Sequence, residues 1–330
     1  MKKLAKVLDD YAKFYRSNKC IICKKPIVKY FKKRKSVLYD DFSKEVTIYE
    51  CTNCNLGYTY PFISQSKLVN LYKNYAPVGQ DDKLKDSPFL KLFKFINFQV
   101  FQTCLKSDNI TLNKIITSCL FQGFFQTFPI FSNQTKKPLE VLDVGCGSGF
   151  FLTMAKHTGC NVYGIEIDKD LVRKLKKSGI NTYSSLEQIK KLNKKFDLIR
   201  FNHVLEHLTD PNHDLKYTCS LLKKRGELII GVPSYNTPAR LFGKYMIMHI
   251  PFHRLHMSKS AVELLVKNSG FKISYRRTKS CGMFTWSFLR MLRLDTSKYR
   301  YPIRLLEMFT LSIFFDLLKI GDSQEIYATK

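Results

Sequence analysis

Three glycines at every second position constrain the fold of this chain more than any other feature. They lie in the stretch VLDVGCGSGF, residues 141–150, where a short apolar run leads directly into Gly145, Gly147 and Gly149. Glycine permits left-handed backbone and leaves no side chain between the backbone and a ligand. At the end of the first strand of an open α/β sheet, such a bend predicts a binding loop for a nucleotide-like molecule. The dinucleotide spacing G-x-G-x-x-G is not met, because Phe150 stands where its third glycine would be.

From residue 138 onward, the pattern alternates between short apolar runs and amphipathic stretches. Repeated βα units of this kind predict a parallel, doubly wound α/β sheet of the Rossmann type. The polar stretch SNQTKKP ends just before this region and marks a domain boundary. Strands are predicted at 139–145, 161–167, 180–185, 196–202, 226–234 and 271–278, and helices at 149–159, 169–179, 186–192, 211–224 and 260–270.

Two cysteine pairs stand near the N-terminus, Cys20-x-x-Cys23 and Cys51-x-x-Cys54, with 27 residues between them. Each pair offers two thiolates on one tight turn, and four thiolates satisfy a tetrahedral zinc ion. The flanking runs are rich in β-branched and aromatic residues, so a small zinc ribbon is expected. Its zinc would be structural, because no coordination position is left open.

Three regions follow from these boundaries: a zinc-ribbon region over 1–65, a helical linker or lid over 66–137, and the sheet domain over 138–330. Within the first two regions, helices are predicted over 1–18 and 66–76 and two more within 84–131.

Two carboxylates accompany the glycine loop. Glu166 ends the second predicted strand, 21 residues beyond Gly145, which is the distance at which an acid meets ribose hydroxyls in this topology. A carboxylate can accept from both hydroxyls at once. Asp143 stands two residues before the first glycine, where the cationic end of an amino acid could rest.

Four motifs in a fixed order carry a resemblance to a known family. VLDVGCGSGF, VYGIEID, FDLIRFNHVLEHLTDP and LLKKRGELIIGVPS make residues 138–330 similar to the class I S-adenosylmethionine-dependent methyltransferases. The four-cysteine knuckle, together with YTYP and LYKNYA, resembles the small-molecule and sugar members of that family. The resemblance implies that the methionine part of S-adenosylmethionine is held by Asp143, Gly145, Gly147 and Gly149, the ribose by Glu166, and the adenine near Ser185 and Leu186.

Asn202 and His203 end the fourth predicted strand, in HVLEHL. That strand lies beside the first in a doubly wound sheet, so both residues should face the methyl end of the cofactor. There His203 is a candidate to position a nucleophile or take its proton; the alternative is a structural hydrogen bond to a neighbouring loop. His203-x-x-Glu206-His207 also has the spacing of some zinc hydrolases. That interpretation is disfavoured, because the motif directly follows a predicted strand and is itself followed directly by LTDP.

A second group of histidines lies in HIPFHRLHMS, residues 249–258. His249, His253 and His256 could be metal ligands. The family resemblance instead implies a lid over the acceptor site, with His253 as the general base. The helix after this segment is expected to begin with the capping-box spacing Ser260-x-x-Glu263.

The chain is strongly basic, with 55 Lys and Arg against 27 Asp and Glu and a net charge of +28. Such an excess suits nucleic acid, an anionic membrane or an acidic substrate, although an evenly spread lysine content would look the same. No secretory leader or bilayer-spanning run is recognised, so a cytoplasmic protein is expected. Residues 89–131 and 284–320 mix aromatic and basic residues; they indicate helix packing or, alternatively, peripheral contact with anionic lipid.

The sequence thus predicts an S-adenosylmethionine-dependent methyltransferase with a structural Zn2+. Its acceptor would be a small molecule or one linked to a lipid or nucleotide, with a sugar or cell-surface glycan precursor expected. One alternative is an RNA methyltransferase whose ribbon grips phosphates, disfavoured because arginine is sparse. The other is a non-catalytic binding protein of the same fold, disfavoured because the glycine loop is intact.

Overall fold

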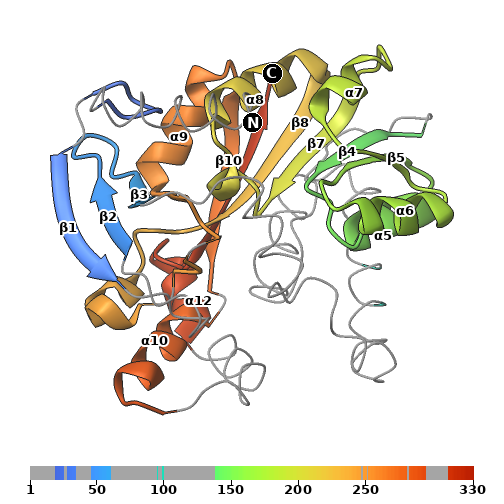
Figure 1. Ribbon diagram of the computed structural model, residues 1–330. Coiled ribbons are helices and arrows are strands. Elements are labelled where there is room, and N and C mark those ends of the chain that lie inside the picture. The colour runs from blue at the N-terminus through green and yellow to red at the C-terminus, as the bar shows by residue number, and fades with distance from the viewer. Residues whose placement is uncertain are drawn as a thin grey trace, which may run out of the picture.

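The computed structural model describes residues 19–25, 28–34, 46–60, 95, 99, 138–246, 248–250, 252–280, 282–294 and 311–330. A seven-stranded sheet in the order β10-β11-β8-β7-β4-β5-β6 forms the centre of the molecule (Figure 1). Its strands are β4 (Glu140–Val144), β5 (Asn161–Ile165), β6 (Asn181–Tyr183), β7 (Phe196–Asn202), β8 (Leu222–Pro233), β10 (Lys272–Lys279) and β11 (Ser323–Thr329).

The strand pairing confirms the predicted doubly wound α/β fold and adds one antiparallel feature. β4 pairs in parallel with both β5 and β7, so the strand order reverses direction at this point. β5 pairs in parallel with β6, and β7 with β8. β11 is antiparallel to both β8 and β10. β11 runs antiparallel to β8, so no crossover connection between these two strands is required. The chain enters β11 from the end of α12.

The helices lie in the connections between the strands and cover the sheet. They are α5 (Phe150–His157), α6 (Lys169–Lys177), α7 (Leu186–Lys190), α8 (Pro211–Leu221), α9 (Lys259–Asn268), α10 (Met283–Met291) and α12 (Leu311–Leu317), with the 3-10 helices η2 (Leu205–His207) and η3 (Pro238–Tyr245). The predicted helix 211–224 ends at Leu221, and β8 begins at once with Leu222. No helix in the described ranges is long and apolar enough to cross a bilayer.

Adjacent residues of β4 show how the two faces are filled. Val141 belongs to a cluster with α5 residues such as Leu152, whereas Leu142 belongs to a second cluster with α8 and α9 residues such as Leu215 and Leu265. Alternating side chains of one strand point to opposite faces, so helices on both faces bury the apolar residues of β4.

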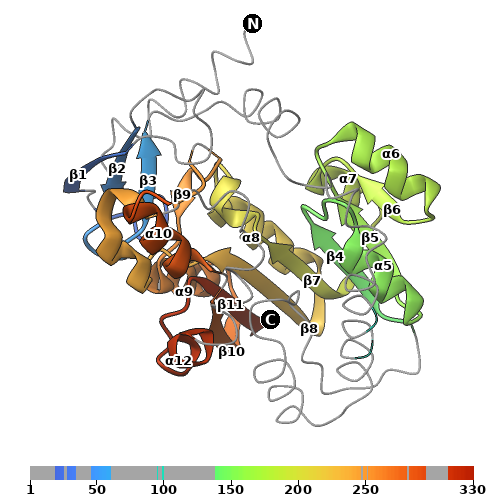
Figure 2. The same cartoon turned by 90° about the horizontal axis from the view of Figure 1, so that it is seen from below.

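The N-terminal strands form a smaller sheet that takes in a strand of the large domain. β1 (Val28–Arg34), β2 (Val46–Glu50) and β3 (Gly57–Tyr60) follow in order, and β9 (Leu255–His256) completes it. This confirms the strands expected around the second cysteine pair. Figures 1 and 2 show this sheet at one end of the molecule and α5 and α6 at the other. The helices predicted over 1–18, 66–76 and 84–131 lie outside the described residues, apart from isolated helical positions at 95 and 99.

The helix after the histidine segment begins differently from the expectation. Ser258, not Ser260, is its N-cap and accepts from the Ala261 N–H at 3.0 Å. Ser260 Oγ instead donates to the Cys54 carbonyl at 2.8 Å. The capping-box prediction at Ser260 was therefore wrong, because a contact with the cysteine cluster takes its hydroxyl.

A buried ion cluster joins the two antiparallel strands at the end of the sheet. Glu325 is fully buried on β11, with Arg277 Nε 2.5 Å from Oε2 and Lys279 Nζ 2.5 Å from Oε1. Burial alone would raise the pKa of Glu325, but the charges of Arg277 and Lys279 outweigh burial and hold that pKa well below its usual range. The ionised form is thus favoured by folding, so the carboxylate stabilises the protein above its unfolded pKa of about 4.3.

We predict that Glu325→Gln lowers the free energy of unfolding by about 3–5 kcal/mol at neutral pH, because it leaves two buried cations without their counter-charge. The difference from wild type should narrow progressively below about pH 4, where the wild-type carboxylate is protonated on unfolding. Urea denaturation across this pH range measures both effects. Asp170→Asn breaks an exposed carboxylate pair with Arg173 and should cost little. Equal stability of Glu325→Gln and wild type at neutral pH would contradict the prediction.

Candidate functional site

The candidate site lies where the strand order reverses, at the carboxyl ends of β4 and β7. In open α/β sheets the loops at such a point diverge to opposite faces and leave a crevice for a ligand. The glycine loop follows β4, and Asn202 and His203 follow β7. The topology therefore brings together two of the motifs that the sequence placed in one site.

All three glycines of the loop adopt left-handed backbone, with φ of 69° at Gly145, 53° at Gly147 and 74° at Gly149. A Cβ on Gly145 would lie 2.5 Å from Val204 Cγ2, on the loop after β7. Gly145 therefore allows the two loops of the crevice to pack against each other. Gly147 lies between the other two glycines, and its backbone contacts the residue that follows β5.

Glu166 turns back from the end of β5 onto this loop. Its Oε2 accepts from the Gly147 N–H at 2.9 Å, and its Oε1 accepts from the N–H groups of Ile167 at 2.7 Å and Asp168 at 3.0 Å. A carboxylate has about four lone-pair positions. The backbone thus fixes the orientation of this side chain and leaves acceptor capacity on Oε2 for a ligand hydroxyl.

Asp143 has a different partner from the one expected from sequence. It is buried on β4, and both carboxylate oxygens accept from Arg200 Nη1 of β7, at 3.0 and 3.1 Å. Burial raises the pKa of Asp143, and the charge of Arg200 opposes that rise. Arg200 also lies over the Phe151 ring, 4.5 Å from its centroid. In this structure Asp143 therefore ties β4 to β7 beneath the glycine loop.

Ser185 and Leu186 stand at the start of α7, beyond the end of β6. The Glu166 N–H donates to the Tyr183 carbonyl at 2.9 Å, so this strand end lies beside Glu166. Ser185 is the N-cap of α7, and Leu186 packs partly buried against the main core. The two residues lie at the same edge of the sheet as the glycine loop, one strand beyond Glu166.

His203 adopts left-handed backbone with φ of 57°, which is uncommon for a residue with a side chain. Its N–H donates to the Gly231 carbonyl of β8 at 2.8 Å, and this bond holds the turn. The side chain is 46% exposed, so it reaches out of the crevice rather than into the core. Residues in such strained conformations cluster at functional sites.

Glu206 lies at the centre of a histidine cluster. Its side chain is 1% exposed, and Oε1 lies 3.4 Å from His203 Nδ1, 3.9 Å from His207 Nε2 and 3.9 Å from His253 Nε2. Burial alone would raise the pKa of Glu206, but His203 and His207 outweigh it and lower that pKa. Burial lowers the pKa of His207 despite the nearby carboxylate. Burial, aided by His207 and His249, lowers the pKa of His253 well below its usual value.

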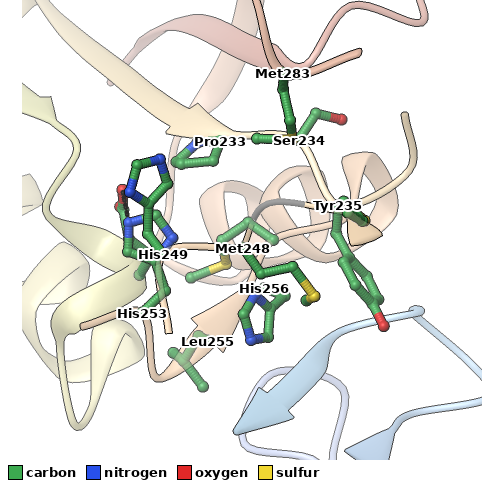
Figure 3. Close-up of a pocket in the computed structure, with 12 residues that line it drawn as sticks. Pro233, Ser234, Tyr235, Met248, His249, His253, Leu255, His256 and Met283 are labelled. Carbon is green, nitrogen blue, oxygen red and sulfur yellow. Dashed lines mark ion pairs between the residues drawn. The ribbon is translucent and has the colours of Figure 1, made fainter. Parts of the chain in front are cut away.

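A pocket lies beside this cluster and opens to solvent; the space between its lining atoms, with the solvent at its mouth included, is about 310 Å³. Figure 3 shows His249 and His253 on one side, with Tyr235 on the other, beside the strands of the small sheet. Methionines contribute much of the apolar wall. Its lining residues are Glu206, Pro233, Ser234, Tyr235, Met246, Met248, His249, His253, Leu255, His256, Met257 and Met283.

The structure brings the four N-terminal cysteines together. Cys20 and Cys54 have their sulfur atoms 3.5 Å apart, Cys23 and Cys51 3.4 Å apart, and all four lie within 4.8 Å of one another. The Tyr58 hydroxyl donates to Cys20 Sγ at 3.0 Å. The Cys54 thiol and, against the effect of burial, the Tyr58 hydroxyl lower the pKa of Cys20 to about 5. The cluster offers four sulfur ligands with a donor already aimed at one of them.

The cysteine cluster is joined directly to the histidine segment. Ser258 Oγ donates to the Cys54 carbonyl at 2.5 Å, and Tyr58 pairs with Leu255 between β3 and β9. Thr59 Oγ1 donates to the His253 carbonyl at 2.9 Å and lies 2.7 Å from His256 Nε2. The segment expected to be a simple lid is thus an edge strand of the small sheet.

Sequence reasoning missed several members of the site. Arg200 carried a signal, since a single arginine within an otherwise apolar strand must find a buried partner. Thr59 and Tyr235 carried none, because their partners lie 197 and 185 residues away in sequence. Tyr235 donates to Glu50, which also accepts from Arg240 Nη2 at 2.8 Å.

Comparison with known proteins agrees with this geometry. Residues 120–275 match a family described as "Methyltransferase domain". A ubiquinone biosynthesis O-methyltransferase of Coxiella burnetii is 33% identical over 116 residues, covering 33% of this chain and 49% of that protein. One from Pelagibacter ubique is 27% identical over 130 residues, covering 36% and 54%. The chain thus spans about half the length of the curated relatives it matches.

Among solved structures, a SAM-dependent methyltransferase from Archaeoglobus fulgidus has a TM-score of 0.41 at 22% identity, covering 59% of this chain and 87% of that one. The assignment of the fold rests on the strand order described above. That strand order and the glycine loop agree with the match of residues 120–275, just under half of the chain, to the methyltransferase domain family.

Proposed function

We propose that this protein transfers a methyl group from S-adenosylmethionine to a small or carrier-linked acceptor. The observation that carries the proposal is the crevice between β4 and β7, where three left-handed glycines and the oriented Glu166 carboxylate meet. Bound S-adenosylmethionine would supply a methyl carbon on a sulfonium: the acceptor lone pair bonds to it, sulfur keeps the electrons of the broken bond, and the acceptor proton leaves.

The residues of the loop fit this cofactor. Gly145, Gly147 and Gly149 offer bare backbone to its methionine part, and Glu166 Oε2 retains capacity for a ribose hydroxyl. Ser185 and Leu186 lie one strand further, at the adenine end. Asp143 would act through Arg200 by holding β4 and β7 together, rather than by touching the ligand.

The acceptor would enter the pocket between the histidine cluster and Tyr235, with Asn202 and His203 at the methyl end. His253 and Glu206 line this pocket, and His203 Nδ1 lies 3.4 Å from Glu206 Oε1, so both histidines are proposed to act on the acceptor. Alignment of acceptor and sulfonium supplies most of the rate in such a displacement, and proton removal assists acceptors that carry a proton.

The curated relatives are ubiquinone biosynthesis O-methyltransferases. They favour a hydroxyl acceptor, and a sugar acceptor stays a prediction from the sequence. Cytoplasmic location likewise stays a prediction. RNA as the acceptor is the alternative, and the excess of positive charge is its support.

We predict that S-adenosylmethionine and S-adenosylhomocysteine bind with micromolar affinity, about −8 kcal/mol, in calorimetry. Gly147→Val should abolish binding, because a branched side chain fills the contact surface at a φ of 53°. Gly159→Ala is the matched control, since Gly159 also has positive φ, 87°, and a Cβ there meets nothing within 4 Å.

Incubation of cell extract with the labelled cofactor should then label a soluble or lipid fraction with wild type and not with Gly147→Val. Label confined to RNA would favour the alternative, and an absence of binding would overturn the proposal.

We also propose that the cysteine cluster holds one structural zinc ion. A tetrahedral site with Zn–S bonds of about 2.3 Å places the sulfur atoms about 3.8 Å apart, close to the observed 3.4 and 3.5 Å. The zinc would fix the first knuckle, whose backbone carbonyls accept from α8 and α9: Asn212 Nδ2 donates to Ile21 O at 2.6 Å and Asn268 Nδ2 to Ile22 O at 3.4 Å.

Cys51→Ser should therefore release one equivalent of zinc and lower the melting temperature, because zinc ligation is largely folding free energy. Metal analysis and thermal melts measure the two effects. Cys219→Ser changes a half-buried cysteine outside the cluster and should alter neither. Full-length protein that lacks zinc, or that melts unchanged after Cys51→Ser, would refute the assignment.

A surface beside the pocket supports the proposed peripheral membrane contact. Phe314, Leu317 and Leu318 on and after α12 are 58%, 76% and 54% exposed, and Leu292 and Leu294 after α10 are 51% and 55% exposed. The two helices touch through the Phe284 and Phe315 rings, with centroids 5.1 Å apart. Exposed Arg293 and Lys319 lie in the same segments, and apolar and basic groups together favour anionic lipid.

Flotation with vesicles tests this contact. The protein should float with vesicles that contain phosphatidylserine, and less with phosphatidylcholine alone. The double variant Leu317→Asp, Leu318→Asp should stay in solution, because burying two carboxylates in the interface is costly. Equal flotation of the double variant and wild type would rule out this surface.

A further inference from the structure

The buried carboxylate of Glu206 lacks the hydrogen-bond donors that such a group requires. Its side chain is 1% exposed, and within the part of the chain that the structure describes neither Oε1 nor Oε2 accepts a hydrogen bond. A buried carboxylate without hydrogen bonds or a nearby cation is strongly unfavourable. Its surroundings therefore call for a positive charge close to the two oxygens.

Besides His203 Nδ1, which lies 3.4 Å from Oε1, two further imidazole nitrogen atoms lie near this carboxylate at distances that suit a bound ion. His207 Nε2 and His253 Nε2 each lie 3.9 Å from Oε1, beyond hydrogen-bonding distance, and the three atoms all lie within 4.8 Å of one another. A tetrahedral ion with bonds of about 2.0–2.1 Å separates its ligand atoms by about 3.4 Å. A movement of about half an ångström would bring each nitrogen to that spacing from the Glu206 oxygen.

Contacts outside the trio hold two of its members in place. The His207 Nδ1–H donates to the Phe252 carbonyl at 2.8 Å, which fixes the ring with Nε2 toward Glu206. Metal-binding histidines almost always donate their second ring N–H in this way. The Arg254 N–H donates to the Glu206 carbonyl at 3.0 Å and joins η2 to the segment that carries His253.

We infer that Glu206, His207 and His253 form a binding site for a divalent first-row transition metal ion with an open position toward the pocket. Two histidines and one glutamate are a ligand set of catalytic zinc sites. Glu206 and His253 line the acceptor pocket, so an acceptor hydroxyl can take the open position. The inference rests on the proposed function and deepens it, since it names the acceptor as a hydroxyl compound.

The site changes the role assigned to His253 within the proposed function. A bound ion would lower the pKa of a coordinated acceptor hydroxyl, so that a weaker proton acceptor would suffice to remove its proton. His253 then serves as a ligand. His203, 3.4 Å from Oε1 with an exposed ring, lies outside the trio and is the group placed to pass the proton to solvent.

Cobalt titration of the full-length protein tests the site directly. With the cysteine cluster loaded with zinc, one further equivalent of Co2+ should bind in calorimetry. Its visible spectrum should show ligand-field bands without a thiolate-to-cobalt charge-transfer band, because no sulfur coordinates it. Glu206→Gln and His253→Asn should each weaken cobalt binding at least about 100-fold, since even outer contacts of a metal site contribute 10–100-fold.

The matched control is His213→Asn. His213 Nδ1 also lies beside a carboxylate, 3.3 Å from Asp214 Oδ1, but the pair is on the surface of α8 and should not affect cobalt. Calorimetry with S-adenosylhomocysteine on every variant reports the cofactor site independently. The inference is overturned, even where the cofactor binds, by either of two results. One is that wild type binds no cobalt beyond the cysteine cluster. The other is that Glu206→Gln and His253→Asn bind cobalt as well as wild type does. Cobalt binding without cofactor binding would instead support the metal site and refute the proposed function.

Discussion

The reversal of strand order between β4 and β7 determines where chemistry can occur in this protein. Both strands are parallel and adjacent, yet their following loops lead to opposite faces. The buried Asp143–Arg200 pair joins the two strands directly below the crevice, and Val204 packs against Gly145 directly above it. A side chain at Gly145 would separate the loops, so the bare backbone serves the packing of the site as much as the contact with a ligand.

The cysteine cluster matters to the site because the histidine segment belongs to its sheet. β9 pairs with β3, and the cap of α9 is formed by Ser258, whose hydroxyl also contacts the Cys54 carbonyl. His253 is held at its backbone carbonyl by Thr59. Loss of the ribbon would therefore release the segment that forms one wall of the pocket. A metal ion held by the four cysteines would therefore affect the pocket by positioning this wall.

Much of this arrangement was predictable from sequence, for physical reasons. The glycine spacing and the βα alternation are local patterns, so they predicted the doubly wound sheet and the loop after β4. Cys-x-x-Cys pairs encode their own geometry, and the four sulfur atoms do converge. The helix over 211–224 was predicted too long, because Leu222 to Lys224 have good helix propensity but Leu222 pairs with Phe196 of β7 and begins β8. Long-range pairing of that kind leaves no local signal.

The same limit explains what was missed at the site. Asp143 was predicted to face the ligand, but its partner Arg200 is 57 residues away and appears only when β7 is placed beside β4. Ser260 fitted a capping box by spacing, yet the carbonyl of Cys54 competes for its hydroxyl. Glu206 stood out in the sequence only through the disfavoured zinc-hydrolase spacing. Glu206 and His253 converge only because η2 contacts the segment after η3. No periodic pattern in the sequence indicates that contact.

Three buried carboxylates of this basic chain show where its reactive chemistry lies. Asp143 faces Arg200, and Glu325 faces Arg277 and Lys279, so both are neutralised by side chains that stay charged at physiological pH. Glu206 is instead approached by imidazoles, which can gain or lose a proton or bind a metal. A fold that needed only stability at this position could have used arginine, as it does at the other two. The imidazoles make the charge around Glu206 exchangeable, and they do so at the wall of the pocket where an acceptor would lose its proton.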